Sequence, residues 1–176
     1  MAAVLYILSI IAANLTVDQF IEFPFGVLVS VGTLFFGATF TLRDYMHQHH
    51  GRQYVYLIIA LALVCNVLVA AWTGTPMRFI VAGFLAIAVS EFADTEVYQR
   101  LRRRNWYVRV LASNSVSIPL DSTIFTVLAF AGIMTSVQMV GIIVGDIIIK
   151  GIIGLLLAFV RDTPIYQRLV LTSPAK

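Results

Sequence analysis

Three ionisable side chains interrupt two long apolar runs. Asp146 and Lys150 are four residues apart in the run 137–160, and Asp121 lies in the run 108–132. Residues four apart share one face of a helix, so Asp146 and Lys150 are expected to form an ion pair. Asp121 has no basic residue at such a spacing, but Pro119 and Ser122 lie close to it. Because proline removes a backbone donor, this segment is predicted to line a polar cavity with freed carbonyls, hydroxyls and a carboxylate.

Structural interpretations of the same residues stay open. Asp146 and Lys150 are equally well explained as a pair that only neutralises itself. For Asp121, a carboxylate bonded to a neighbouring helix is the alternative, and the role in lining a cavity is favoured. Glu91 and Asp94 are three apart, next to a basic stretch. For Asp94, charge balance at the membrane surface is the favoured interpretation. The candidate substrate-binding residues are the following: Asn14, Glu91, Asn114, Asp121, Ser122, Asp146 and Lys150.

The residues favour binding over catalysis. The three histidines gather in the segment 47–50, where none can serve as the base for a buried serine. Asp121 and Asp146 could form an intramembrane aspartyl pair, but the Gly-x-Gly-Asp signature of such proteases is broken before Asp146. Cys65 is the only cysteine, so no intrachain disulfide can form. We find no motif for a metal ion or a cofactor, and an enzyme is the minority hypothesis.

The composition indicates a membrane protein. Of the 176 residues, 60% are hydrophobic and only 12% are charged, whereas soluble domains are about half apolar and about a quarter charged. The net charge of +3 is confined to short stretches between apolar runs. A basic surface for nucleic acid is therefore not expected.

Six apolar runs are each near the ~20 residues that a helix needs to cross the hydrocarbon core. They predict an all-α integral membrane protein, a bundle of six transmembrane helices forming a single domain over residues 1–176. Gly141 and Gly145 form a GxxxG pattern, which predicts close helix packing. The segments 43–53 and 94–107 are expected to be the longest loops. The six runs cover residues 2–16, 25–42, 54–72, 77–93, 108–132 and 137–160.

Basic residues predict the orientation of the bundle. Ten of them fall on one side of the predicted membrane, and only Arg78 falls on the other. Because short loops rich in Lys and Arg stay cytoplasmic, both termini are predicted to be cytoplasmic. The ten are Arg43, Arg52, Arg100, Arg102, Arg103, Arg104, Arg109, Arg161, Arg168 and Lys176.

The segment 90–132 reads SEFADTEVYQRLRRRNWYVRVLASNSVSIPLDSTIFTVLAFAG. It contains an acidic residue before Val97-Tyr98, a basic loop, a serine-rich helix carrying Asp121-Ser122, and Ala129-Phe130 further on. This pattern resembles the queuosine precursor transporter family, also called the vitamin-uptake-transporter-like family. The resemblance is specific between residues 93 and 132 and looser over the rest of the chain.

The resemblance implies a multi-pass protein of the bacterial inner membrane. It implies import of queuosine precursors, such as 7-cyano- or 7-aminomethyl-7-deazaguanine, for tRNA modification. It also implies a fold akin to the substrate-binding subunits of energy-coupling-factor transporters, so a subunit that needs a separate energising module is the alternative. The expected partners are a deazapurine, the lipid bilayer, and either another copy of the chain or such a module. An intramembrane aspartyl hydrolase is the less favoured alternative.

Overall fold

The computed structural model describes residues 1–24 and 27–160, with the side chain of Val160 left out. This part of the chain contains six helices, as predicted, and one pair of short strands. The elements, in chain order, are α1 (Ala2–Leu15), β1 (Phe20–Phe23), β2 (Val27–Ser30), α2 (Val31–His50), α3 (Arg52–Trp72), α4 (Met77–Arg100), α5 (Trp106–Phe130) and α6 (Ser136–Val160).

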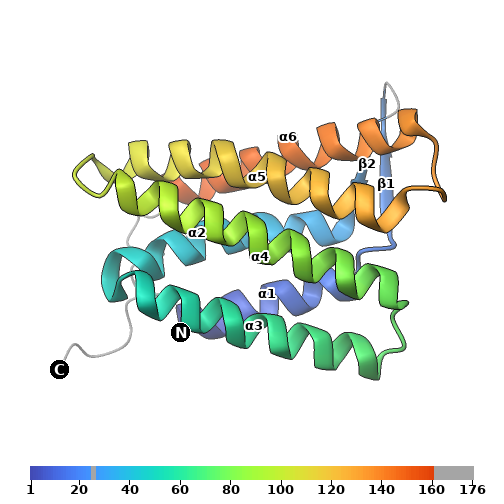
Figure 1. Ribbon diagram of the computed structural model, residues 1–176. Coiled ribbons are helices and arrows are strands. Elements are labelled where there is room, and N and C mark those ends of the chain that lie inside the picture. Colours follow the sequence, from blue (N-terminus) through green and yellow to red (C-terminus); the bar gives the residue numbers. More distant parts are fainter. Residues whose placement is uncertain (25–26, 161–176) are drawn as a thin grey trace.

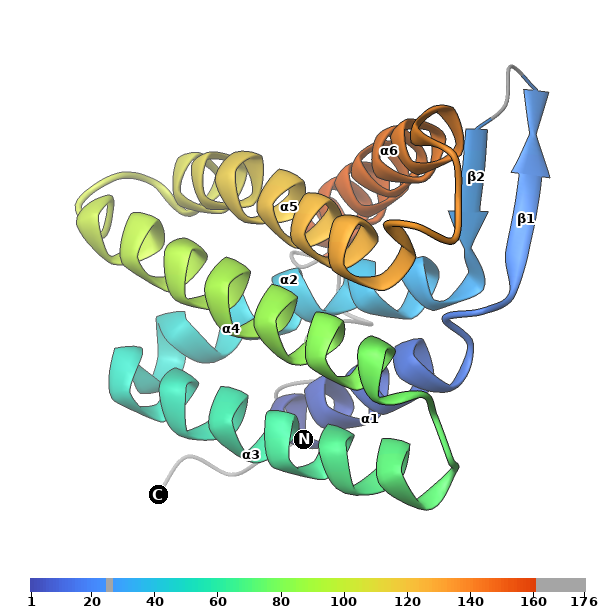
Figure 2. The same cartoon turned by 45° about the vertical axis from the view of Figure 1, so that its right-hand side comes forward.

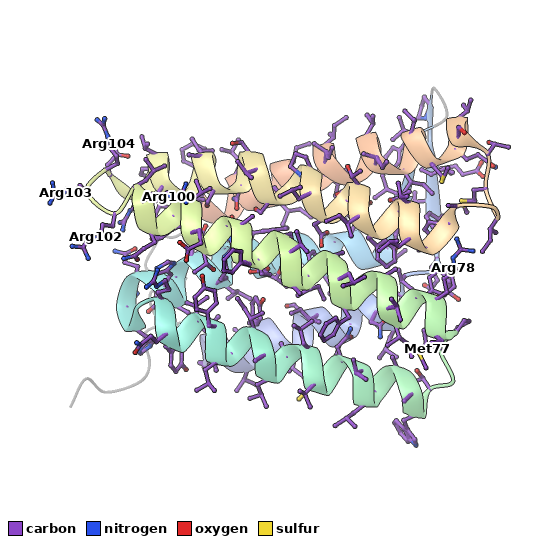
Figure 3. All side chains as sticks on the ribbon, viewed as in Figure 1. Met77, Arg78, Arg100, Arg102, Arg103 and Arg104 are labelled. Carbon is purple, nitrogen blue, oxygen red and sulfur yellow. The ribbon has the colours of Figure 1, made fainter. Side chains whose placement is uncertain are left out.

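Successive helices run in opposite directions along one bundle (Figure 1). α2 is central, since it packs against α1, α3 and α6. The basic turn that holds Arg102, Arg103 and Arg104 lies at one end of the bundle, and Arg78 lies at the other (Figure 3). The predicted separation of these basic residues is therefore present. Four positions used in the sequence predictions lie outside the described residues: Phe25, Arg161, Arg168 and Lys176.

An antiparallel hairpin corrects the prediction of an all-α fold and of a span that starts at residue 25. β1 pairs with β2 in a register that sets Phe20 opposite Ser30 and Phe23 opposite Val27. β-Branched and aromatic residues favour this extended pairing. The Ser30 side chain then caps α2 by accepting a hydrogen bond from Gly32 N at 3.1 Å. Figure 2 shows the hairpin at one end of the bundle, beside the turn between α5 and α6.

The two segments expected to be loops are mostly helical, which corrects a second prediction. α2 continues through residues 43–50, and α4 continues through residues 94–100. A buried ion pair between Arg43 and Asp94 holds these two helix ends together. Gly51, at a φ of 80°, then provides the left-handed turn into α3 that other residues rarely adopt.

Apolar side chains cover the outside of the bundle, while polar side chains fill much of the inside. On α3, large hydrophobic residues that recur at helical spacing are exposed, among them Leu57, Leu61, Val64 and Leu68. Such a surface is unusual on a soluble monomer, whereas it is expected on a protein whose outside faces lipid. Among the described residues, Arg52–Trp72 and Ser136–Phe159 are the two helices long and apolar enough to cross a membrane by length and composition alone. The protein is accordingly a membrane protein.

Gly145 brings α6 against the hairpin. A Cβ atom at this position would lie 2.6 Å from the carbonyl oxygen of Leu28, which is too close for any side chain. The GxxxG pattern thus does mark a close approach at Gly145, but the neighbouring backbone is that of strand β2. This contact fixes the hairpin beside the polar interior of the bundle.

Candidate functional site

A buried pocket lies between α1, α2, α3, α4, α5 and α6, below the hairpin. The centres of water-sized molecules can occupy about 70 Å³ of it, several times the ~10–15 Å³ that one water needs. Most of its wall is apolar, and a few polar groups converge on it, as in small-molecule sites. The polar side chains that line it are Asn14, Ser30, Thr33, Asn66, Asp121, Asp146 and Lys150.

Lys150 links two helices at the floor of this pocket. Its Nζ donates to Asp121 Oδ2 at 2.7 Å, to Ser122 Oγ at 3.1 Å and to Asp146 Oδ2 at 3.4 Å. The predicted pair of Asp146 and Lys150 is therefore present. The shortest bond, however, goes to Asp121 on α5, a residue for which helical spacing offered no partner. Because every polar proton of the ammonium has an acceptor, this buried cation is well compensated.

Asp121 and Asp146 differ in how firmly the carboxylate oxygen that does not contact Lys150 is held. Asp146 Oδ1 accepts a hydrogen bond from Thr33 Oγ1 at 2.5 Å. Asp121 Oδ1 has only a 3.4 Å contact with Ser90 Oγ. Asp121 is therefore the carboxylate whose outer oxygen a ligand can engage at the lower cost in existing bonds.

Two amide side chains face the pocket with unused hydrogen-bonding atoms. Asn14 Nδ2 and Asn66 Oδ1 are both buried without a hydrogen-bond partner among the described residues. A buried polar atom without a partner is unfavourable unless a ligand or water satisfies it. Asn14 belongs to the predicted set. Asn66 was left out of that set, although a lone amide inside the apolar run 54–72 is the signal that would have found it.

Aromatic rings form part of the pocket wall. Phe36 and Phe125 both line it, and Lys150 Nζ lies 5.2 Å from the centre of the Phe36 ring. A ring next to charged and amide groups can pack against the face of a flat ligand. The helix that carries Phe125 and Asp121 continues across Pro119. Pro119 therefore does not end the helix, although it cannot donate the backbone hydrogen bond that another residue would donate there.

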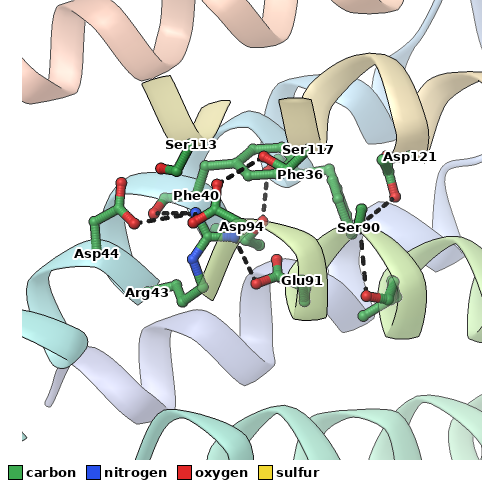
Figure 4. Close-up of polar contacts among 12 residues, drawn as sticks. Phe36, Phe40, Arg43, Asp44, Ser90, Glu91, Asp94, Ser113, Ser117 and Asp121 are labelled. Carbon is green, nitrogen blue, oxygen red and sulfur yellow. Dashed lines mark hydrogen bonds and ion pairs between the residues drawn. The ribbon is translucent and has the colours of Figure 1, made fainter. Parts of the chain in front are cut away.

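Glu91 lies outside this pocket, in a second buried group that we name the Arg43 cluster: Arg43, Asp44, Glu91 and Asp94. Arg43 Nη1 is 2.7 Å from Glu91 Oε2, and Nη2 is 2.7 Å from Asp94 Oδ2 and 3.1 Å from Asp44 Oδ1. Figure 4 shows the guanidinium between these carboxylates. The interpretation of Asp94 as a surface charge was wrong, because Asp94 is fully buried.

Arg43 is the residue that sequence reasoning placed wrongly. It was counted among the loop residues that set the orientation, and its side chain has no exposed surface. Three acidic residues stand near the ends of the apolar runs 25–42 and 77–93, but the sequence alone does not bring these two ends together. Once the fold does, the single arginine beside these acids is their natural partner.

Asn114 also lies apart from the main pocket. It borders a separate cavity between α5 and α6, together with Ile118 and Gly151. Ser122 does not line the main pocket, but it accepts a hydrogen bond from Lys150 and so helps to position that ammonium. The pocket is thus lined by four of the seven predicted residues: Asn14, Asp121, Asp146 and Lys150. A fifth, Ser122, contacts the Lys150 ammonium from outside the pocket lining.

The histidine segment is part of helix α2. His47 is buried, its Nε2 lies 3.0 Å from Gln99 Oε1, and its ring stacks on Tyr98. Burial lowers the pKa of His47 below its ordinary value. The described residues contain no group of three or more His, Cys, Asp or Glu side chains arranged to hold a metal ion.

A buried, partly polar pocket between membrane helices is the arrangement in which small-molecule transporters bind their substrates. A family model described as "Putative vitamin uptake transporter" matches residues 69–166, more than half of the chain. The chain belongs to this family. The matched segment includes Asp121, Asp146 and Lys150. No curated protein and no solved structure matches the chain.

Proposed function

We propose that this protein imports a 7-deazaguanine precursor of queuosine, such as 7-cyano-7-deazaguanine, across the bacterial inner membrane. The observation that supports it is the pocket in which Asp121, Asp146 and Lys150 meet Phe36 and Phe125. A guanine-like base needs an acceptor pair for its amino and ring N–H groups, a donor for its carbonyl oxygen, and a flat apolar surface for its ring.

Asp121 supplies the acceptor pair in this proposal. Its two oxygens face the amino group and the adjacent ring N–H, which fixes the orientation of the base. Lys150 keeps its bond to Asp146 and donates to the carbonyl oxygen of the base. Asn14 and Asn66, whose amide atoms lack partners among the described residues, supply further hydrogen bonds.

The arrangement of Asp121 and Asp146 supports transport over an aspartyl hydrolase. An aspartyl pair shares one proton between two facing carboxyl groups. Here Lys150 Nζ contacts both carboxylates, so an ammonium stands where the shared proton and the attacking water would be. We further propose that all six helices cross the membrane, with both termini in the cytoplasm.

Uptake by cells that cannot make the precursor tests this function. Cells expressing the protein are supplied with labelled 7-cyano-7-deazaguanine, and cell-associated label is compared with that of cells carrying an empty vector. We expect accumulation only with the protein. Equal label in both strains, with the protein present in the membrane, would contradict the proposal.

Co-purification distinguishes a self-sufficient importer from a binding subunit. The protein is extracted in mild detergent, and the associated proteins are identified. A stoichiometric ATPase partner would assign it to an energy-coupling-factor-type complex, whereas uptake by the purified chain alone in liposomes would show that no such module is needed.

A further inference from the structure

The Arg43 cluster carries more acid than base. Three carboxyl groups surround one guanidinium, and all four side chains are without exposed surface. If all four were ionised, the cluster would hold a net charge of −2 in the interior of the protein. Burying uncompensated charge is strongly unfavourable, and a buried acid neutralises instead by holding a proton.

Two members of the cluster, Glu91 and Asp44, each have a buried carboxylate oxygen without a hydrogen-bond partner among the described residues, and Glu91 is the one of the two that interacts with the Tyr6 hydroxyl. Glu91 Oε2 is bonded to Arg43, while Oε1 is the oxygen without such a partner. The hydroxyl of Tyr6, on α1, interacts with Glu91 and makes no other hydrogen bond among the described residues. A proton on Glu91 Oε1 would be donated to the Tyr6 hydroxyl oxygen, which satisfies both atoms at once.

The groups that face Glu91 come from four helices. They are Tyr6 on α1, Arg43 and Asp44 on α2, Asp94 on α4, and Asp121 on α5. Only Arg43 among them is basic. Asp121 is itself paired with Lys150, so the surplus of acid around Glu91 lies in the Arg43 cluster.

Serine hydroxyls between α4 and α5 contact the pocket on one side and the Arg43 cluster on the other. Ser90, next to Glu91 in the chain, lies with its Oγ 3.4 Å from Asp121 Oδ1. On the other side, Ser117 Oγ donates to Asp94 Oδ1 at 2.7 Å. Figure 4 shows both contacts. A ligand that engages Asp121 Oδ1 therefore competes for the hydrogen bond of Ser90, whose neighbour in the chain is Glu91.

We propose that Glu91 is the proton-binding site that couples substrate import to the proton gradient. The proposal rests on the transport function proposed above and adds its energy source. In the inward step a proton from the outer aqueous phase forms an O–H bond with Glu91 Oε1. That bond breaks again when the proton is released to the cytoplasm with the substrate, and no other covalent bond changes.

Purified protein in liposomes tests the coupling. The probe is labelled 7-cyano-7-deazaguanine, which is uncharged, and the membrane potential is held at zero with potassium and valinomycin. A gradient of one pH unit, alkaline inside, should raise the accumulation ratio about tenfold for one proton per substrate, since one unit corresponds to a factor of ten. Uptake that ignores the gradient would overturn the coupling and leave the transport function standing. No uptake under either condition would overturn both.

Glu91→Gln then tests the residue. We expect it to lose accumulation driven by the gradient while retaining exchange of internal for external substrate, because glutamine fills the same space and cannot take up the proton. Glu96→Gln, on the same helix but partly exposed in a pair with Arg52, is the matched control and should accumulate as the wild type does. Full accumulation by Glu91→Gln would overturn the assignment.

If Glu91→Gln loses exchange as well, Glu91→Asp decides the question. That variant keeps a carboxyl group one methylene further from Tyr6. Retained accumulation that depends on the gradient, with a shifted dependence on pH, would support the proton site. Exchange without any accumulation would overturn it.

Discussion

Lys150 Nζ on α6 lies 2.7 Å from Asp121 Oδ2 on α5, closer than it lies to Asp146 on its own helix. The pair connects two helices that each contribute a wall of the pocket. It also makes the charge of the pocket depend on both helices at once, since removing Lys150 leaves the carboxylates of Asp121 and Asp146 buried without their cation. The first two predictions follow from this relationship.

Asp121→Asn should reduce precursor uptake at least tenfold. The substitution replaces one acceptor oxygen by a donor that faces the donors of the base. The loss of a hydrogen bond to a charged group is about 1.5–3 kcal/mol, and about 1.4 kcal/mol is a factor of ten in binding. Uptake is measured alongside protein abundance in the membrane. Glu22→Gln, on the exposed hairpin, is the control. Normal uptake by a well-expressed Asp121→Asn protein would show that this carboxylate is structural.

Lys150→Met should destabilise the protein more than the double variant Lys150→Met with Asp121→Asn. The single change leaves two buried carboxylates without their cation, and breaking a buried pair costs about 3–5 kcal/mol. Neutralising Asp121 as well removes one of those charges, so part of the loss should return. The measurement is thermal unfolding of the purified variants in one detergent. Losses that simply add would contradict a direct interaction between the two residues.

The helices were predictable because their apolar runs are long and are separated by clear turn residues. The hairpin was not, because residues 20–23 and 27–30 are as apolar as a helix end and too short for their period to be diagnostic. Only the tertiary contact between Leu28 and Gly145 shows why an extended backbone is held there.

The pocket was predictable in its residue types but not in its partners. Asp121, Asp146 and Lys150 were found because charge inside an apolar run is unfavourable without a partner or a cavity. Their pairing could not be derived, since spacing along one helix gives contacts within that helix only. The same limit explains Arg43: a basic residue at the end of an apolar run has the pattern of a loop anchor, and only the fold shows that it meets acids from α4.

Gly145→Ala should destabilise the protein, whereas Gly151→Ala on the same helix should not. The new methyl group at position 145 would lie 2.6 Å from the Leu28 carbonyl oxygen, so the hairpin must move. Overpacking of this kind typically costs about 1–3 kcal/mol. At position 151 nothing lies within 4 Å of the added atom, and alanine favours the helix by up to about 1 kcal/mol. Thermal unfolding of both variants compares them, and equal stability would contradict the close contact.

Cysteine labelling should place the basic turn and Arg78 on opposite sides of the membrane. In a Cys65→Ala background, Arg103→Cys should react with a membrane-impermeant maleimide only after the cells are opened. Thr73→Cys, in the exposed turn between α3 and α4, should react in intact cells. These outcomes follow from the rule that basic loops stay cytoplasmic. The reverse pattern would invert the proposed orientation, and labelling of both positions in intact cells would rule out this topology.

Acidification below about pH 6.5 should destabilise the protein through His47. This residue lies in the last turn of α2, at the end of the bundle that carries the basic turn, and burial lowers its pKa in the folded state. The unfolded chain, in which histidine has a pKa of about 6.5, then binds a proton that the folded chain does not. Stability is therefore unaffected above the unfolded-state pKa and falls as the pH drops below it. Unfolding temperatures at pH 7.5 and pH 5.5 should differ less in His47→Gln than in the wild type. His50→Gln, at an exposed position of the same helix, should keep the wild-type difference. An unchanged pH dependence in His47→Gln would assign the effect to other groups.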